Sequence, residues 1–274
     1  MHYARCMRYL RVDGTILALA ASLFATSHLY AQSSEAQRLA PSGELRMAFI
    51  VSNAALVKRT PDGKFSGVLI DIANALASKL GMTLHPVPYD NIERYNRSIG
   101  KDEWDVALTP RDLSRIERLS FSEPFLVVDN GYVARPGSSL ISADDVDRTG
   151  IKVAVAEHSP ADGYLTRTLK KAKIVRLPRG IDEARQALTF GSADVYADNA
   201  QLTDLIAAEI PGATVLVGRF NSVPLTFAVP KSNASALSLL NDFVNEAKHD
   251  GVIADAIKRA GLRGVRMPIG LNKP

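Results

Sequence analysis

The stretch Trp104-Asp-Val-Ala-Leu-Thr-Pro-Arg-Asp-Leu-Ser-Arg115 indicates most about the fold of this chain. Residues 106–108 have the β-branched and apolar side chains of a short buried strand. Thr109 is a suitable helix N-cap, Pro110 fits the first helical position, and Asp112 follows three residues after the cap. We therefore expect a strand that ends directly at the start of a helix. The unpaired backbone N–H groups at the start of that helix can bind an anion.

Two basic side chains fall on the expected helix, which would cover residues 109–118. Arg111 and Arg115 are four residues apart, so a helix places them on one face. The Thr109 hydroxyl, the helix start and two guanidinium groups would then meet at one place. The alternative is a capped helix with a solvated basic face, and this stretch by itself fits both interpretations.

The same pattern occurs a second time. Residues 153–155 are strand-like, and Ser159-Pro160-Ala161-Asp162 repeats the order of cap, proline and acid. In open α/β sheets, ligands bind at the carboxyl ends of the strands. The repetition therefore predicts two similar halves that face each other across a ligand site, with Ser159 on the second half.

The composition limits the possible function classes. The chain has 274 residues, 46% of them hydrophobic, which is enough for two modest domains or one large one. The formal net charge of +4 comes from 33 basic and 29 acidic residues. No basic run is interleaved with aromatic residues, so we expect no nucleic-acid partner.

The N-terminus has the features of a secretory signal peptide. Three arginines open it, and residues 14–25 form an apolar run too short to span a bilayer comfortably. We expect residues 1–31 to be a signal peptide that is cleaved after Ala31. A retained membrane anchor is the alternative. The sole cysteine, Cys6, would leave with this segment, so no disulfide or thiolate metal site is expected in the mature chain.

The remainder alternates between strand and helix patterns after an expected loose linker at residues 32–42. This alternation predicts an α/β fold with a parallel sheet and helices on both faces. Strands are expected at 45–51, 83–87, 104–108, 127–133, 151–155, 173–177, 193–197, 214–217 and 224–229. Further helices are expected at 67–80, 92–100, 160–170, 181–190, 200–209, 237–247 and 252–260.

Several short motifs occur in an order that resembles a known family. They are Gly43-Glu-Leu-Arg46, Phe65-Ser-Gly-Val-Leu-Ile-Asp71, Trp104-Asp-Val-Ala-Leu108, Leu119-Ser-Phe-Ser-Glu-Pro-Phe125, Gly191-Ser-Ala-Asp194 and Val229-Pro-Lys231. Over residues 43–262 the chain resembles the periplasmic solute-binding proteins of family 3, which serve polar amino-acid ABC importers, as a divergent member.

The resemblance implies the two-lobed periplasmic-binding-protein fold of type II, in which each lobe is a mixed sheet flanked by helices. Two extended crossings join the lobes, here near residues 132–135 and 226–229. Lobe 1 would take residues 43–133 and, as a return segment, 226–270. Lobe 2 would take residues 136–224.

The resemblance also implies roles for particular residues. Arg115 matches the arginine that holds the ligand's carboxylate, for which a bidentate guanidinium is suited. Ser159 matches the hydroxyl donor of the second lobe. The family's hydroxyl three residues before the arginine falls on Asp112, which cannot donate, and its acid for the ligand's amino group falls on Asn199, beside Asp198.

Thr109 and Arg111 complete the set of expected ligand-binding residues. The departures from the family pattern leave two solute classes open. One is an α-amino acid, and the other is a more anionic or differently shaped small solute.

The leading prediction is a periplasmic binding component of an ABC-type importer that captures a small polar or anionic solute, an amino acid or an organic acid. We expect a monomer that is not an enzyme, needs no cofactor, and has a solute and an inner-membrane permease as partners. One alternative is a periplasmic enzyme similar to cyclohexadienyl dehydratases, with Glu157 and His158 as the candidate acids. Another is an accessory protein of a periplasmic quinoprotein dehydrogenase.

Overall fold

The computed structural model describes residues 34–51, 56–111, 115–157, 159–178 and 180–268. In these residues one mixed sheet joins 11 strands in the order β4-β1-β5-β12-β7-β10-β8-β9, with β11 and β13 added to β7 and β6 added to β12. The strands of this sheet are β1 (Glu44–Ile50), β4 (Thr83–Tyr89), β5 (Val106–Pro110), β6 (Leu119–Phe121), β7 (Leu126–Ala134), β8 (Lys152–Ala156), β9 (Lys173–Leu177), β10 (Val195–Asn199), β11 (Thr214–Val215), β12 (Asn221–Pro230) and β13 (Val265–Arg266).

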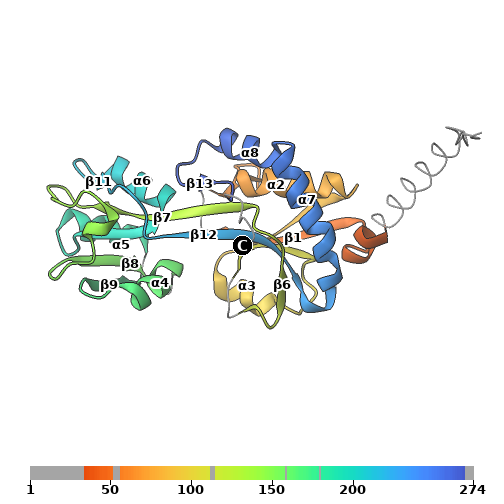
Figure 1. Ribbon diagram of the computed structural model, residues 1–274, viewed down its shortest axis with the longest axis horizontal. Helices are drawn as coiled ribbons and strands as arrows, with labels where there is room; N and C mark the ends of the chain where they lie inside the picture. Colours follow the sequence, from red (N-terminus) through yellow and green to blue (C-terminus); the bar gives the residue numbers. More distant parts are fainter. Residues whose placement is uncertain (1–33, 52–55, 112–114, 158, 179, 269–274) are drawn as a thin grey trace, which may run out of the picture.

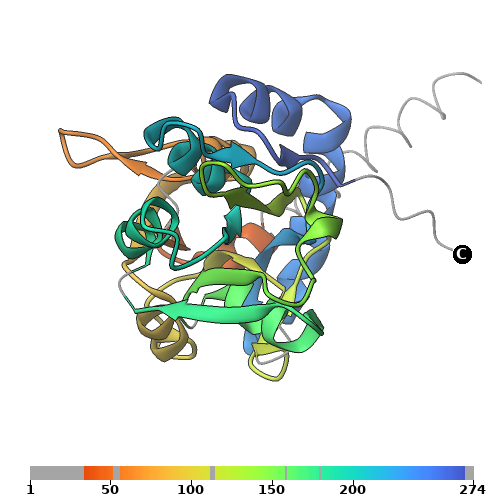
Figure 2. The same ribbon diagram turned by 90° about the vertical axis from the view of Figure 1, so that its left-hand side faces the viewer.

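Helices cover this sheet. They are α2 (Val68–Lys79), α3 (Ile92–Ser98), α4 (Pro160–Thr168), α5 (Ile181–Thr189), α6 (Ala200–Glu209), α7 (Leu237–His249) and α8 (Val252–Ala260), with short 3-10 helices η2 (Ala143–Asp145) and η3 (Lys231–Ala236). A small separate hairpin consists of β2 (Lys58–Arg59) and β3 (Phe65–Ser66). In Figure 2 this hairpin, in orange, extends away from the body of the protein.

The elements form two groups, which we call the first and second lobes. In the first lobe, β1 runs parallel to both β4 and β5, and α2, α3, α7 and α8 pack around these strands. In the second lobe, β8 runs parallel to β9 and β10, flanked by α4, α5 and α6. Figure 1 shows the two lobes at opposite ends of the long axis.

Helix α2 shows how sequence produces the packing of the first lobe. Its buried residues Val68, Ile72 and Leu76 repeat at the spacing of one helical face, which packs into the main apolar core. Gly67 precedes the helix with a φ of 118°, and a Cβ there would lie 2.5 Å from the Leu56 carbonyl oxygen. Only glycine therefore fits at the entry to this helix.

Two long strands, β7 and β12, connect the lobes (Figure 1). They pair with each other over residues 126–130 and 221–225. Beyond this stretch β7 pairs with β10 of the second lobe, and β12 pairs with β5 of the first. The chain thus passes between lobes somewhat earlier than the crossings expected at 132–135 and 226–229. The lobe boundaries at 43–133, 136–224 and 226–270 stay predictions.

The helix expected at residues 109–118 is wrong at its start. Thr109 and Pro110 are the last two residues of β5, and Thr109 pairs with Thr226 of β12. Strand β12, which comes more than a hundred residues later in the sequence, lies beside Thr109 and pairs with it. This pairing overrides the local capping pattern. Pro110 is tolerated because it stands at the strand's end. Arg115 lies in a short 3-10 turn, and Asp112 is outside the described residues.

The loose linker expected at residues 32–42 is also wrong in its described part. Residues 34–39 are helical. Ala36, Leu39 and Ala40 are buried and belong to the core of the first lobe. Their small and apolar side chains complete the packing beside η3, so the segment is ordered by burial. The expected signal peptide lies outside the described residues. No helix in the described ranges is long and apolar enough to cross a membrane.

Candidate functional site

The carboxyl ends of strands from the two lobes face each other. Strand β5 ends at Pro110, opposite Leu225 of β12, and β10 ends at Asn199, opposite Asn130 of β7. Asn130 in turn pairs with Asn221 of β12. The two strand ends are therefore separated along β12 by the four steps from 221 to 225, which corresponds to about 13 Å. Strands β7 and β12 form the floor between them.

On the first-lobe side, Arg115 is held in a buried position. The residue is only 6% exposed, and its Nη1 donates a hydrogen bond of 2.6 Å to Thr109 Oγ1. The guanidinium lies over the ring of Tyr95, 5.5 Å from the ring centroid. A charged group this deeply buried persists only when hydrogen bonds and nearby partners stabilise it. The planar fork of Arg115 is suited to a carboxylate.

Tyr95, which lies under the guanidinium, packs with two further aromatic side chains, Tyr89 and Trp104. Tyr95 stacks on Trp104 with ring centroids 5.9 Å apart, and Tyr89 meets Tyr95 edge-on at 5.8 Å. The indole Nε1 of Trp104 donates to Ser98 Oγ at 2.8 Å, which fixes the stack to α3. Burial raises the pKa of Tyr95, and the nearby Arg115 and Thr109 act in the opposite direction.

Arg111 directly follows the last residue of β5 and is exposed. Because Thr109 and Pro110 are extended, these residues do not provide the helical face that was expected to join Arg111 to Arg115. Arg111 adds positive charge at the first-lobe edge, while Arg115 is buried.

On the second-lobe side, Ser159 caps α4 as predicted. Its Oγ accepts a hydrogen bond of 3.1 Å from the Asp162 backbone N–H, and Pro160 stands in the first turn. Strands β8 and β10 are parallel neighbours, with Val155 opposite Ala197. Ser159 and Asn199 therefore follow the ends of adjacent strands at the same edge of the sheet.

Asn199 has a structural role that the sequence analysis missed. Its Oδ1 accepts from the Leu202 N–H at 3.0 Å and so caps α6, while its Nδ2 donates to Asp198 Oδ1 at 3.0 Å. The preference of asparagine for N-cap positions before an apolar helix was the available signal.

Asp198 is satisfied by neutral donors. Its Oδ1 also accepts from the Asn199 backbone N–H at 2.7 Å, and its Oδ2 accepts from the Tyr196 hydroxyl at 2.6 Å. Burial raises the pKa of Asp198, and these hydrogen bonds oppose that shift. Since residues two apart on a strand share a face, Asp198 lies on the side of Tyr196, which packs in the core beneath α5 and α6.

The floor contributes polar groups that sequence reasoning also missed. Asn130 Nδ2 donates to Asn221 Oδ1 at 2.7 Å between the two connecting strands. Asp129 forms an ion pair with Arg266 at 3.2 Å and accepts from Ser222 Oγ at 2.6 Å. These partners are far apart in the sequence, so no local pattern identifies them.

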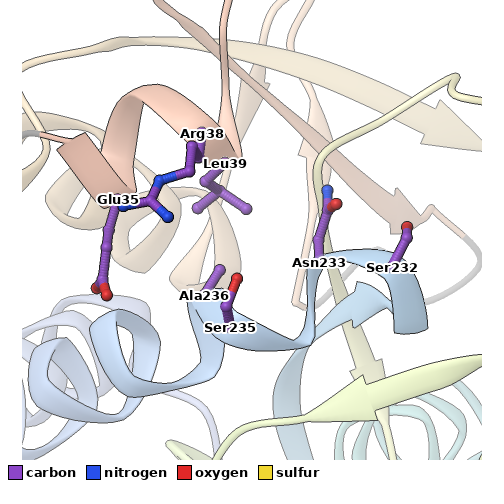
Figure 3. A pocket seen from close by; sticks show the side chains of 7 residues that line it. All are labelled: Glu35, Arg38, Leu39, Ser232, Asn233, Ser235 and Ala236. Atoms are coloured by element: carbon purple, nitrogen blue, oxygen red, sulfur yellow. The ribbon is translucent and has the colours of Figure 1, made fainter.

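A separate hollow of about 250 Å³ lies between the helical residues 34–39 and η3 (Figure 3). Its lining includes Glu35, Arg38 and Ser235, and none of the residues expected to bind a ligand. In the described ranges no group of three or more His, Cys, Asp or Glu side chains is placed to hold a metal ion. The facing strand ends are therefore the better candidate site.

Comparisons with solved structures identify the fold. A putative ABC-transporter binding component from Wolinella succinogenes complexed with lysine has a TM-score of 0.68 at 23% identity, covering 80% of this chain and 95% of that one. An ancestral amino-acid-binding protein described as a precursor of cyclohexadienyl dehydratase has a TM-score of 0.66 at 22% identity, covering 82% and 98%. The predicted two-lobed fold of type II is confirmed by these structures.

A curated relative corrects one prediction. The chain is 28% identical over 201 residues to the cyclohexadienyl dehydratase of Pseudomonas aeruginosa, covering 69% of each protein. This relative is an enzyme. The expectation that the chain is not an enzyme, which was drawn from the family resemblance, is therefore not supported.

The sequence profile named "Bacterial extracellular solute-binding proteins, family 3" matches residues 45–261, which is most of the chain. The motif order, the facing strand ends and the solved structures agree with this match. The chain belongs to the bacterial extracellular solute-binding proteins of family 3.

Proposed function

We propose that the protein captures a small solute bearing a carboxylate between its two lobes in the periplasm and delivers it to an ABC permease of the inner membrane. The observation that carries this proposal is the buried Arg115, fixed by Thr109 and Tyr95 at a strand end that faces the second lobe. The solved binding component complexed with lysine supports solute capture on this fold.

The proposed mechanism is closure of the lobes around the solute. Arg115 and Thr109 contact it from the first lobe, and Ser159 and Asn199 contact it from the second. A solute that touches both lobes stabilises the arrangement in which both sets of contacts exist. Strands β7 and β12 supply the hinge, because they are the segments that pair with each other between the lobes.

A thermal-shift screen of the mature protein against amino acids, dicarboxylates, 2-oxo acids, aromatic acids and sugar acids tests the proposal. A ligand at ~100 times its dissociation constant adds about 2.7 kcal/mol to the free energy of unfolding. We expect Arg115→Met to weaken the best ligand by roughly 30-fold or more, because the loss of a buried charged hydrogen bond costs about 2 kcal/mol or more.

The matched control is Arg97→Ala, which removes one positive charge from a side chain that is 63% exposed on α3. It leaves the affinity unchanged if Arg115 is the anchor. An unshifted panel, or a ligand bound equally well by Arg115→Met, contradicts the proposal.

A dehydratase activity is the second candidate, and the identity to cyclohexadienyl dehydratase favours it. Loss of water from a cyclohexadienyl alcohol needs an acid that protonates the departing hydroxyl. Glu157 is exposed directly after β8, at the same edge as Ser159. The test is turnover of such an alcohol, followed by the ultraviolet absorption of the aromatic product. Turnover that is abolished in Glu157→Gln supports this candidate. The absence of turnover by the wild-type protein contradicts it.

The periplasmic location is tested separately. Osmotic-shock fractionation followed by N-terminal sequencing is expected to yield a mature chain that begins at Gln32. A protein that remains in the membrane fraction with its first residues intact contradicts the cleaved signal peptide.

A further inference from the structure

The two strand edges that face each other are both rich in hydrogen-bond donors. On the first lobe, Arg115 is buried against Thr109 and Tyr95, and Arg111 stands exposed immediately after β5. Guanidinium groups donate and never accept. This edge therefore suits a carboxylate or another anionic group.

The second-lobe edge presents donors as well. The Oγ of Ser159 accepts from the Asp162 N–H, which leaves its hydroxyl hydrogen to be donated to another group. The carbonyl oxygen of Asn199 is engaged by the Leu202 N–H, and one hydrogen of its Nδ2 goes to Asp198. The second Nδ2 hydrogen is the group that this amide can offer to a solute.

Asp198 is badly placed to act as an acceptor for a solute. Both of its carboxylate oxygens already accept, from the Asn199 backbone and side chain and from the Tyr196 hydroxyl. It lies on the Tyr196 face of β10, which packs against the helices of the second lobe. A solute ammonium placed beside Ser159 and Asn199 would meet hydrogen-bond donors, and unmatched charge at a desolvated site is costly.

We propose that the solute carries an anionic or acceptor group at each end and lacks the α-ammonium of an amino acid, as in a dicarboxylate or a 2-oxo acid. This inference rests on the proposed function. One end binds Arg115, and the other end accepts from Ser159 and Asn199. Glu157 is the acid at this edge that could instead hold an ammonium, and the comparison of matched ligands decides between the two.

Calorimetric titration with two matched pairs tests the inference: 2-oxoglutarate against glutamate, and malate against aspartate. The members of each pair differ only in the group on C2. We expect at least one oxo or hydroxy diacid to bind about tenfold or more tightly than its amino partner. Equal or tighter binding of the amino partner overturns the inference, and so does a panel in which no diacid or 2-oxo acid binds.

The failure of this inference differs from the failure of the proposed function. If amino acids bind better than their oxo or hydroxy partners and lose affinity in Arg115→Met, solute capture is supported and only the proposed class of solute is wrong. If no carboxylate binds at all, the proposed function and the proposed class of solute are both contradicted.

A variant at the second-lobe edge gives an independent readout. Asn199→Asp keeps a residue that caps helices well and adds an acceptor. It is expected to shift the affinity ratio of the matched pairs toward the amino partner by about tenfold. Asn233→Asp makes the same charge change on η3, away from the strand ends, and should leave the ratio unchanged. An unshifted ratio in Asn199→Asp contradicts the role given to this residue.

Discussion

At the scale of the residue, the position of Arg115 depends on partners that the sequence does not show. The place of Arg115 in a motif predicts its role, and the local pattern predicts a helix that would orient it. In the structure, Thr109 and the ring of Tyr95 perform that orientation. Tyr95 comes from α3, twenty positions earlier, so its contact with Arg115 depends on how α3 packs, which no local spacing reveals. The donor type was predictable, and its support was not.

Tyr95 is expected to influence ligand affinity through Arg115. Tyr95→Leu removes the ring beneath the guanidinium, which should weaken binding roughly 2- to 30-fold, the range of a cation–π contact. It should also lower the free energy of unfolding by roughly 1–3 kcal/mol because a buried ring is lost. Tyr95→Phe keeps the ring and should retain affinity. Equal affinity in Tyr95→Leu and Tyr95→Phe, measured by calorimetry on folded protein, would show that the ring does not orient Arg115.

Asp198 should make stability depend on pH. Burial raises the pKa of Asp198 above its ordinary value of 3.8, so the folded state keeps this proton to higher pH than the unfolded state does. The free energy of unfolding therefore decreases as the pH rises from about 3.8 through the folded-state pKa. Asp198→Asn lacks this titration. Urea denaturation at a series of pH values should show the stability of the wild type falling relative to Asp198→Asn, and a constant difference contradicts the shift.

At the scale of the element, two identical sequence patterns have different outcomes. Ser159 and Thr109 are each followed by proline and, two residues later, by aspartate. Ser159 caps α4, because the turn after β8 leaves the chain free to begin a helix. Thr109 instead extends β5, because β12 lies alongside and pairs with it. The strands and helices expected elsewhere were largely predictable from periodicity, but a partner strand more than a hundred residues away was not.

The segment after α8 ties the two lobes together and is sensitive to side-chain size. Arg263 pairs with Asp204 of α6, and the Asp129 N–H donates to the Gly264 carbonyl at 2.7 Å. Gly264 has a φ of 70°, and a Cβ there would lie 2.4 Å from the Cβ of Ala200. The chain can pass this close to the start of α6 only with glycine.

Gly264→Ala is therefore expected to destabilise the protein more than a comparable change in open space. Gly137 has a similar φ of 72°, and a Cβ there would meet nothing within 4 Å. Both variants incur the strain of a positive φ, but only Gly264→Ala adds overpacking, worth about 1–3 kcal/mol. Chemical denaturation of both variants measures this difference. Equal losses would show that the segment does not pack tightly against α6.

At the scale of the whole molecule, the site consists of two edges held apart by β7 and β12. The sequence predicted two halves with facing strand ends, and the order of motifs predicted the family. It did not predict where the connecting strands pair, because the paired residues, such as Asn130 and Asn221, lie far apart in the sequence. It also missed the packing of residues 34–40, whose polar composition conceals the buried positions Ala36, Leu39 and Ala40.

Solute capture between the lobes is tested most directly by small-angle X-ray scattering of the mature protein, with and without the carboxylate that gives the largest thermal shift. Solute capture between the lobes predicts that the radius of gyration decreases when this ligand is added. It also predicts no decrease in Arg115→Met at the same ligand concentration. A ligand that binds with an unchanged radius of gyration, or that compacts Arg115→Met equally, would contradict binding between the two lobes at Arg115.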